Sequence, residues 1–190
     1  MGTKHVLPLQ KIGEIHWADN LKKFLHKYDI IAQGISLQEE TSLITFGLGD
    51  EIRLYYKHFG RTDSAEFMYY LRKPAELEWL HQSRHVAALA EQFSDDTLAG
   101  YVVISESVTG EPICLHIDTQ AIYTFTKKPV GKHLLFHSFN DFLLVELIQL
   151  KKQVCEFDFE SMEEEYRFVD TVVDNSDISQ ELRHEKLYKK

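Results

Sequence analysis

The chain has 190 residues, 44% of them hydrophobic and 12% aromatic, which suits one folded domain with a substantial core. The formal net charge of −9 disfavours sequence-independent binding of nucleic acid and of anionic membranes, because both need a basic surface. No apolar run reaches the roughly 18 residues of a membrane span. The first residues lack the apolar core of a signal peptide, and two cysteines are too few for a disulfide framework. These features predict a cytoplasmic protein and favour a basic protein as its partner.

The first part of the chain shows one helical pattern followed by two short alternating runs. Apolar residues recur at helical spacing between lysines, which predicts a helix over residues 16–29. Residues 43–47 and 52–56 alternate apolar and polar side chains, and a Gly-Leu-Gly-Asp segment lies between the two runs. Alternation around turn residues predicts a β-hairpin.

The segment that follows combines a strand pattern with a helix pattern. Residues 65–73 place large apolar side chains on one face at period two, which predicts a third strand. Pro74 ends that run and suits the first turn of a helix. Residues 74–93 are rich in good helix formers and predict this helix, although their apolar stripe is irregular.

Three runs of β-forming residues occupy the centre of the chain, at 101–105, 112–117 and 121–125. The turn segments between them are short, whereas a parallel crossover needs a dozen or more residues. The spacing therefore predicts an antiparallel meander. Its core face is expected to combine alternate residues of two strands, Ile113, Leu115 and Ile117 with Ala121, Tyr123 and Phe125. Cys114 and His116 lie between them in the sequence.

Helices are predicted on the carboxyl side of the meander. Residues 137–152 contain an apolar face, Ser138 is a candidate N-cap, and Asp141 suits the positive end of a helix. Residues 156–165 hold six acids. An apolar series at three-and-four spacing nevertheless predicts an amphipathic helix there: Phe159, Met162, Tyr166, Val169 and Val173. From about residue 175 the sequence predicts a frayed helix or a disordered end.

The histidines and Cys114 offer only weak patterns for a metal or catalytic site. His81 and His85 lie four apart on a predicted helix, but the glutamate of the zinc motif His-Glu-x-x-His is missing. His133 and His137 flank a predicted helix start, so their spacing does not place them on one face. Cys114 and His116 point to the same side of one strand, which does not pair a nucleophile with a base.

The carboxylates of the meander allow two interpretations. Glu106, Glu111 and Asp118 lie in predicted turns, where acidic residues are ordinary. Paired carboxylates can perform acid–base catalysis, and His116 with Glu106 or Asp118 would make a small hydrolase. That alternative requires these side chains to meet in a concave pocket. The sequence favours the other interpretation, with no catalytic residues, no metal and no cofactor.

The order of these motifs resembles the SMI1/KNR4 superfamily, also called SUKH. The segment KKFLHKYDI is similar to the family's early helix. GYVVISES, a turn at Val108, Thr109 and Gly110, and ICLHIDTQAIYTF resemble its central strands. A Ser-Phe-x-x-Phe-Leu helix at Ser138 closes the unit, so the resemblance covers residues 16 to 150. Gln120 stands where the family usually has glycine, and a left-handed conformation there costs glutamine about 1 kcal/mol relative to glycine.

The resemblance implies an α+β fold in which helices flank an antiparallel meander sheet, with an extra C-terminal amphipathic helix in this chain. Residues 1–155 would form one SMI1/KNR4-like domain, and residues 156–190 an acidic helix and tail. Members of the family are binding modules, and many bacterial members are immunity proteins that neutralise a cognate toxin, often a nuclease. Others are regulatory scaffolds, which is the alternative role for this chain.

An acidic surface that covers the basic substrate groove of a toxin would perform the immunity function. The expected contacts lie on the turns of the meander and on the tail helix: Glu106, Glu111, Asp118, Glu163, Glu164 and Glu165. The run of acids in the tail has a plainer interpretation as the solvated face of a helix.

Overall fold

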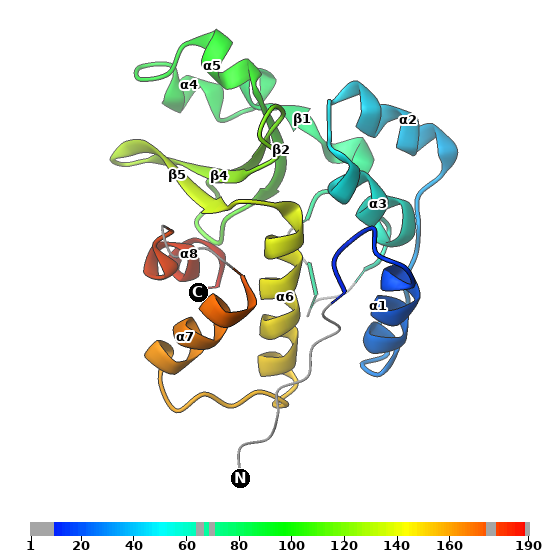
Figure 1. Cartoon of the computed structure of the whole chain (residues 1–190). Coiled ribbons are helices and arrows are strands. Elements are labelled where there is room, and N and C mark those ends of the chain that lie inside the picture. The colour runs from blue at the N-terminus through cyan, green and yellow to red at the C-terminus, as the bar shows by residue number, and fades with distance from the viewer. Residues whose placement is uncertain (1–9, 64–66, 69–70, 174–177, 189–190) are drawn as a thin grey trace.

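The computed structural model describes residues 10–63, 67–68, 71–173 and 178–188 and has an α+β fold (Figure 1). Within these residues lie eight α-helices, two short 3-10 helices and a five-stranded sheet. The α-helices are α1 (Trp17–His26), α2 (Leu37–Thr45), α3 (Asp50–Phe59), α4 (Val86–Leu89), α5 (Asp95–Ala99), α6 (Phe139–Gln153), α7 (Met162–Val172) and α8 (Gln180–Leu187). The 3-10 helices are η1 (Pro74–Glu76) and η2 (Leu80–Gln82). The strands are β1 (Glu78–Trp79), β2 (Tyr101–Glu106), β3 (Pro112–His116), β4 (Ile122–Lys127) and β5 (Val130–Phe136).

The sheet confirms the predicted antiparallel meander. Its strands follow the chain in the order β1-β2-β3-β4-β5, and each pairs antiparallel with the next. Short turns connect each strand from β2 to β5 with the next one, and connections this short require antiparallel pairing. Strand β5, which forms a hairpin with β4, was not predicted from the sequence.

Both faces of the sheet are covered, which the sequence did not predict. Leu115 lies opposite Ile122 and faces the main core, whereas Cys114 lies opposite Tyr123 and faces a second, smaller core. Phe125 belongs to that second core, so Tyr123 and Phe125 share a face with Cys114 and not with Leu115. The expected single core face of this hairpin was therefore wrong. Side chains alternate along each strand, and the register decides which sets meet.

The helices form unequal layers on the two faces. Figure 1 shows α6 along one face, with α1 and α3 on one side of it and α7 and α8 on the other. The short helices α4 and α5 lie on the opposite face, where Leu89 and Leu98 fill the second core. Residues from α7 and α8, such as Val169 and Leu187, join the main core.

Capping fixes where several helices begin. Ser138 accepts a hydrogen bond from the Asp141 N–H at 3.1 Å and starts α6, as predicted. Ser36 and Glu39 form a capping box at the start of α2. The predicted helix over residues 16–29 is confirmed as α1.

The hairpin predicted over residues 43–47 and 52–56 was wrong, because these residues lie mostly in α2 and α3. Period-two alternation in a short run also fits a helix when residues three and four apart are apolar. Ile52, Tyr55, Tyr56 and Phe59 have that spacing and are all buried. The capping box of α2 and the acids at the start of α3 were the signals for helices.

Residues 65–73 and 74–93 also depart from the predictions. Residues 64–66 and 69–70 lie outside the described part, and the described remainder of the predicted strand contains no strand. The predicted helix over residues 74–93 was wrong, because it is divided into η1, β1, η2 and α4. Trp79 pairs with Val102 of β2. Backbone groups at the edge of β2 gain partners in this way, which outweighs the local helix propensity.

The tail confirms its predicted helix but not the whole of its predicted apolar face. Val169 and Val173 are buried, whereas Met162 is 49% exposed and Glu165 points inward. Beyond it, α8 spans Gln180–Leu187 and buries Arg183 and Lys186. Residues 174–177 and 189–190 of the predicted frayed end lie outside the described residues.

Candidate functional site

Gln120 organises the turn between β3 and β4. Its φ of 59° is in the left-handed region that favours glycine. Its side chain reaches the loop between α2 and α3, where Oε1 accepts from the Gly49 N–H at 2.6 Å and Nε2 donates to the Gly47 carbonyl at 3.3 Å. Nε2 also donates to the carbonyl of Ile117. These bonds offset the backbone strain and explain a glutamine where the resemblance leads one to expect glycine.

A hollow of about 320 Å³ lies beside this turn. Three segments far apart in the sequence line it: the start of α3 at residues 49–52, the turn residues Thr119 and Gln120, and the start of α6 at residues 137–139. Gln120 thus both fixes the turn and forms part of the wall. Concave sites where several elements converge are common positions for binding.

The helix starts at the hollow are already satisfied within the chain. The Gly49 N–H donates to Gln120, and the Asn140 N–H donates to Glu51 Oε2 at 3.1 Å. Ser138 accepts from the Asp141 N–H. Helix N-termini attract anions through unsatisfied N–H groups, and here side chains of the chain itself accept from these three donors.

Two carboxylates at the start of α3 line the hollow, and a third precedes the lining residues of the turn. The Asp50 side chain is 85% exposed and pairs only with Arg53 of its own helix among the described residues. Glu51 and Asp118 are also exposed. The rim acids, which we define as Asp50, Glu51 and Asp118, favour a cationic group at this surface. Asp118 was predicted as a contact from the sequence, whereas Asp50 and Glu51 were missed because α3 was interpreted as a strand.

Glu106 is held in an ion-pair cluster at the end of β2. Arg72 bridges Glu78 at 2.6 Å and Glu106 at 2.8 Å, and Arg84 contacts Glu106 at 2.5 Å. Burial opposes ionisation of Glu106, but the hydrogen bond from Arg72 and the charges of both arginines lower its pKa below the ordinary value. Glu106 is therefore a carboxylate whose charge the chain itself neutralises.

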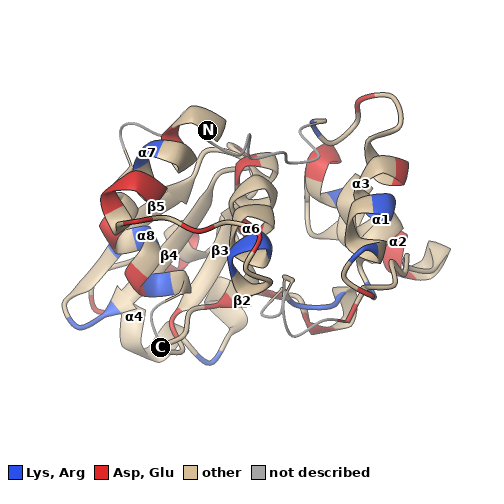
Figure 2. Cartoon of the chain, turned by 90° about the horizontal axis from the view of Figure 1, so that it is seen from below, with Lys and Arg blue, Asp and Glu red and all other residues tan. Residues whose placement is uncertain are grey.

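Glu111 and Glu165 are neutralised in the same way by cations of the chain. Glu111 lies 2.8 Å from Lys186 Nζ, and both side chains are 11% exposed. Glu165 accepts from Gln149 Nε2 at 2.8 Å and pairs with Lys152 Nζ at 2.6 Å. Figure 2 shows the acids gathered where α7 begins. Of the acids predicted on this helix, Glu163 is exposed and Glu164 partly exposed.

The candidate catalytic pair of His116 and Glu106 is separated. Tyr101 lies opposite His116 in the sheet, and Glu106 is at the other end of the same strand, about 17 Å away at the rise of a strand. His116 Nδ1 lies 3.1 Å from Thr119 Oγ1. Cys114 is fully buried, and burial raises its thiol pKa well above the ordinary value.

The paired histidines do not assemble a metal centre in the described structure. Among the residues that the structure describes, no three His, Cys, Asp or Glu side chains are grouped as metal ligands. His85 is buried, its ring nitrogens have no hydrogen-bond partner within the described ranges, and burial lowers its pKa. His85 Nε2 lies 3.6 Å from Glu106 Oε1, beside the ion-pair cluster at the end of β2.

A comparison with models of known protein families finds no match. Searches of curated proteins and of solved structures find no match either. In the described part of the chain, no helix has both the length and the apolar character to cross a membrane. The resemblance to the SMI1/KNR4 superfamily, the cytoplasmic location and the absence of catalysis stay predictions.

Proposed function

We propose that this chain is a non-enzymatic protein-binding module that engages a basic partner at the hollow beside Gln120. The observation that supports it most directly is the outward arrangement of the rim acids. Asp50 and Glu51 line this concave surface, Asp118 directly precedes its turn residues Thr119 and Gln120, and the local N–H donors are bonded within the chain. A lysine or arginine of a partner would meet complementary charge there.

The adjacent helix α2 supplies apolar surface of the kind that binding requires. Leu37 and Ile44 are 80% and 57% exposed, and seven residues of separation places them on one face of the helix. The loop that follows α2 leads into the hollow through Gly47 and Gly49. Interfaces combine apolar anchors with a polar rim, and this half of the molecule offers both.

The biological role that we propose is that of an immunity protein of the SMI1/KNR4 type. Its mechanism would be occlusion: the acidic surface covers the basic groove of a toxin such as a nuclease and excludes its substrate. The net charge of −9 supports such a partner. A regulatory scaffold on the same fold is the second candidate, and it differs in the partner alone.

Binding and rescue assays with the proteins encoded beside this gene test the proposal. Co-expression should protect cells from a neighbouring toxin, and purified proteins should form a complex whose association slows at high salt. A neighbouring protein that binds but is not toxic would favour the scaffold. No complex with any neighbour and no protection would contradict the binding-module proposal.

Charge-reversal variants then locate the surface. Asp50→Lys with Asp118→Lys should lower affinity about 100-fold, since each rim charge contributes about tenfold. Glu91→Lys with Glu181→Lys is the matched control, because these acids are exposed and no segment of the hollow contains them. Glu163→Lys with Glu164→Lys tests the tail helix. Loss of binding only in the tail variant would move the contact from the hollow to α7.

A further inference from the structure

Helix α2 exposes a row of uncharged side chains. Leu37 and Ile44 are 80% and 57% exposed, and the exposed Thr41 lies between them, four residues after the first and three before the second. This spacing places the three side chains on one face of the helix. Figure 1 shows α2 at the periphery of the molecule, with α3 between it and α6. We call Leu37, Thr41 and Ile44 the α2 face.

The charged residues of α2 are neutralised within the chain. There are two of them, Glu39 and Glu40. Glu39 accepts from the Ser36 N–H at 2.8 Å and pairs with Arg61 at 2.7 Å. Glu40 Oε1 lies 3.6 Å from Lys57 Nζ. Both acids thus have a cation of the chain beside them, in contrast to Asp118 at the hollow, for which no ion pair is found among the described residues.

The hydroxyl groups of α2 are also bonded within the helix. Thr41 Oγ1 donates to the Leu37 carbonyl at 3.1 Å. Ser42 and Thr45 donate to the carbonyls four residues before them, at 3.3 and 3.2 Å. Burying a polar group costs free energy unless the group has a hydrogen-bond partner. Because these donors already have partners, an apolar surface can cover the α2 face at little cost.

The α2 face and the hollow lie close together along the chain. Asp50 at the rim has a side chain that is 85% exposed, and Ile44 is six positions before it. Six residues span at most about 20 Å, and Leu37 lies about 10 Å from Ile44 along the helix. A single helix of about 20 residues is about 30 Å long. One such helix is therefore long enough to contact both regions.

The spacing and the charges indicate which kind of partner fits. Leu37 and Ile44 are separated by the distance between positions i and i+7 of a helix, whereas side chains on one face of a strand recur about every 7 Å. The rim acids favour a cation. We propose that the partner contributes an amphipathic helix, with apolar residues at i, i+4 and i+7 on the α2 face and arginine or lysine at one end, in the hollow. This inference rests on the proposed function and specifies the partner's binding segment.

A synthetic helical peptide is the probe for the full chain. It has about 20 residues, with leucine at i, i+4 and i+7 and arginines in its last turn, and fluorescence anisotropy measures its binding. Leu37→Gln with Ile44→Gln should weaken binding about 30-fold, because a few apolar anchors supply most of the affinity. Ile15→Gln with Met162→Gln is the matched control, since these side chains are 79% and 49% exposed outside α2, and it should bind as the wild type does.

Two changes in the peptide test the expected geometry. A peptide of the same composition with its leucines out of helical register should bind at least about tenfold more weakly, since it presents no continuous apolar face. A peptide with glutamate in place of arginine should lose a similar factor at the rim acids. Equal binding of either peptide, or an equal loss in the Ile15 and Met162 control, would overturn the proposal.

Methyl NMR of the wild-type chain gives a measurement that needs no variant. The peptide should shift the methyl signals of Leu37, Thr41 and Ile44 and leave those of Ile15 and Met162 unchanged. Shifts confined to Ile15 or Met162, or no binding at all, would contradict the inference. So would a dimer of the chain that the Leu37 and Ile44 substitutions abolish, because a second copy would then cover the α2 face.

A natural partner separates this inference from the proposed function. If a neighbouring protein binds, and Leu37→Gln with Ile44→Gln weakens the complex more than the Ile15 and Met162 control does, the inference is supported. A complex that keeps its affinity in the α2 variant and loses it in Asp50→Lys with Asp118→Lys would overturn the amphipathic helix alone. The proposed binding at the hollow would then stand.

Discussion

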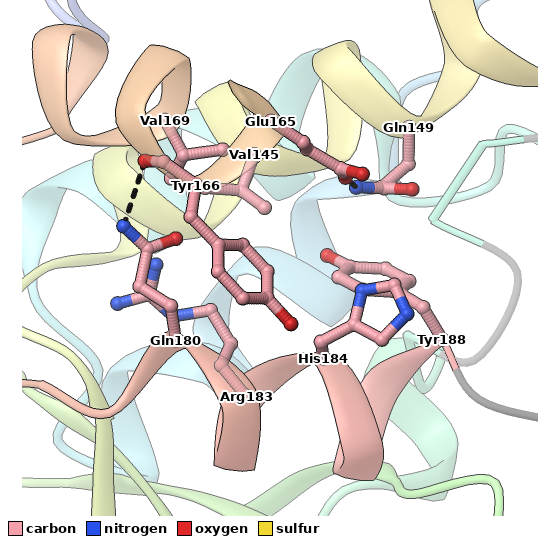
Figure 3. Close-up of a pocket in the computed structure, with 9 residues that line it drawn as sticks. All are labelled: Val145, Gln149, Glu165, Tyr166, Val169, Gln180, Arg183, His184 and Tyr188. Atoms are coloured by element: carbon pink, nitrogen blue, oxygen red, sulfur yellow. Dashed lines mark hydrogen bonds between the residues drawn. The ribbon is translucent and has the colours of Figure 1, made fainter. Parts of the chain in front are cut away.

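Two polar regions adjoin helix α6, and they differ in whether their buried hydrogen-bonding groups have partners. At its start, the hollow beside Gln120 has its N–H donors bonded within the chain and its carboxylates exposed. Along its side, between α7 and α8, the terminal nitrogens of Arg183 and the hydroxyl of Tyr166 are buried and have no hydrogen-bond partner among the described residues (Figure 3). The first arrangement leaves negative charge available to a macromolecular partner, whereas the second places polar atoms where solvent and partners do not reach them.

Both regions also depend on contacts between segments that are distant in the sequence. Gln120 joins the meander to the loop before α3, and Lys186 joins α8 to Glu111 beside the turn that follows β2. These contacts position each region before any ligand arrives. Variants that remove these contacts distinguish side chains that stabilise the fold from side chains that are available for binding.

The largest effect is expected at the ion pair that docks α8. Lys186→Met leaves the Glu111 carboxylate buried without its cation, and breaking such a pair costs about 3 kcal/mol. Urea denaturation measures this loss. Adding Glu111→Gln should recover part of it, because the uncompensated charge is then gone. Lys128→Met on the exposed hairpin is the control, and an equal loss there would refute the buried-pair explanation.

Glu146 should make stability fall as pH rises. Burial raises the pKa of this α6 carboxyl to about 7, against the opposing effect of the hydrogen bond from Tyr188 at 2.6 Å. A raised folded-state pKa contributes stability that is fully present below about 4.5 and is lost as pH rises through 7. Because Glu146 retains some exposure, we expect the loss to be about 2 kcal/mol.

Glu146→Gln is the variant that checks this. Its denaturation midpoint should stay nearly constant between pH 5 and 8, because the amide does not titrate there. The midpoint of the wild type should fall over the same range. Glu163→Gln on the exposed start of α7 should decline as the wild type does. Parallel pH profiles for wild type and Glu146→Gln would show that another group causes the dependence.

Gln120 tests the hollow through two substitutions of one residue. Gln120→Ala keeps the left-handed backbone and removes the bonds to Gly47 and Gly49, which should cost about 1.5 kcal/mol. Gln120→Gly removes the same bonds but relieves the strain, so it should be about 1 kcal/mol more stable than the alanine variant. Chemical denaturation of both variants measures the difference. Equal stabilities would mean that strain is not present at this turn.

The smallest effect is expected at Tyr166, between α7 and α8. Tyr166→Phe removes a buried hydroxyl that has no hydrogen-bond partner in the part of the chain that the structure describes, so stability should be unchanged or rise by about 0.5 kcal/mol. Tyr188→Phe is the contrasting variant, because its hydroxyl donates to Glu146, and it should lose about 1 kcal/mol. Calorimetry of the two variants resolves these signs. A clear loss in Tyr166→Phe would indicate a partner for that hydroxyl.

Local patterns predicted the elements whose signals lie in consecutive residues. Runs of β-formers separated by turns predicted β2, β3 and β4, and Ser138 predicted the start of α6. The predictions failed in α2 and α3, where the apolar residues fit both a strand period and a helix period. They also failed where pairing with a distant segment of the chain decides the conformation. Trp79 is extended because it pairs with Val102 of the neighbouring strand β2. The residues around Trp79 in the sequence do not reveal this pairing.

The candidate sites were predicted less well than the fold. Asp118 was correctly placed on an exposed turn, but charge alone does not distinguish Glu106, Glu111 and Glu165, which pair with cations of the chain, from acids that face solvent. The cations that pair with them come from residues 13 to 75 positions away, such as Lys152 and Lys186. Asp50 and Glu51 were missed together with the helix that they begin.

The sequence by itself determined an acidic α+β protein with a meander, a capped helix after it and an amphipathic tail helix, because periodicity, turn residues and caps act over a few residues. Tertiary structure alone decided that the sheet has two covered faces and that α8 docks through Lys186. It also decided which carboxylates remain exposed. Burial and ion pairing depend on which distant segments meet, and the free energy of a charge depends on its neighbours in space.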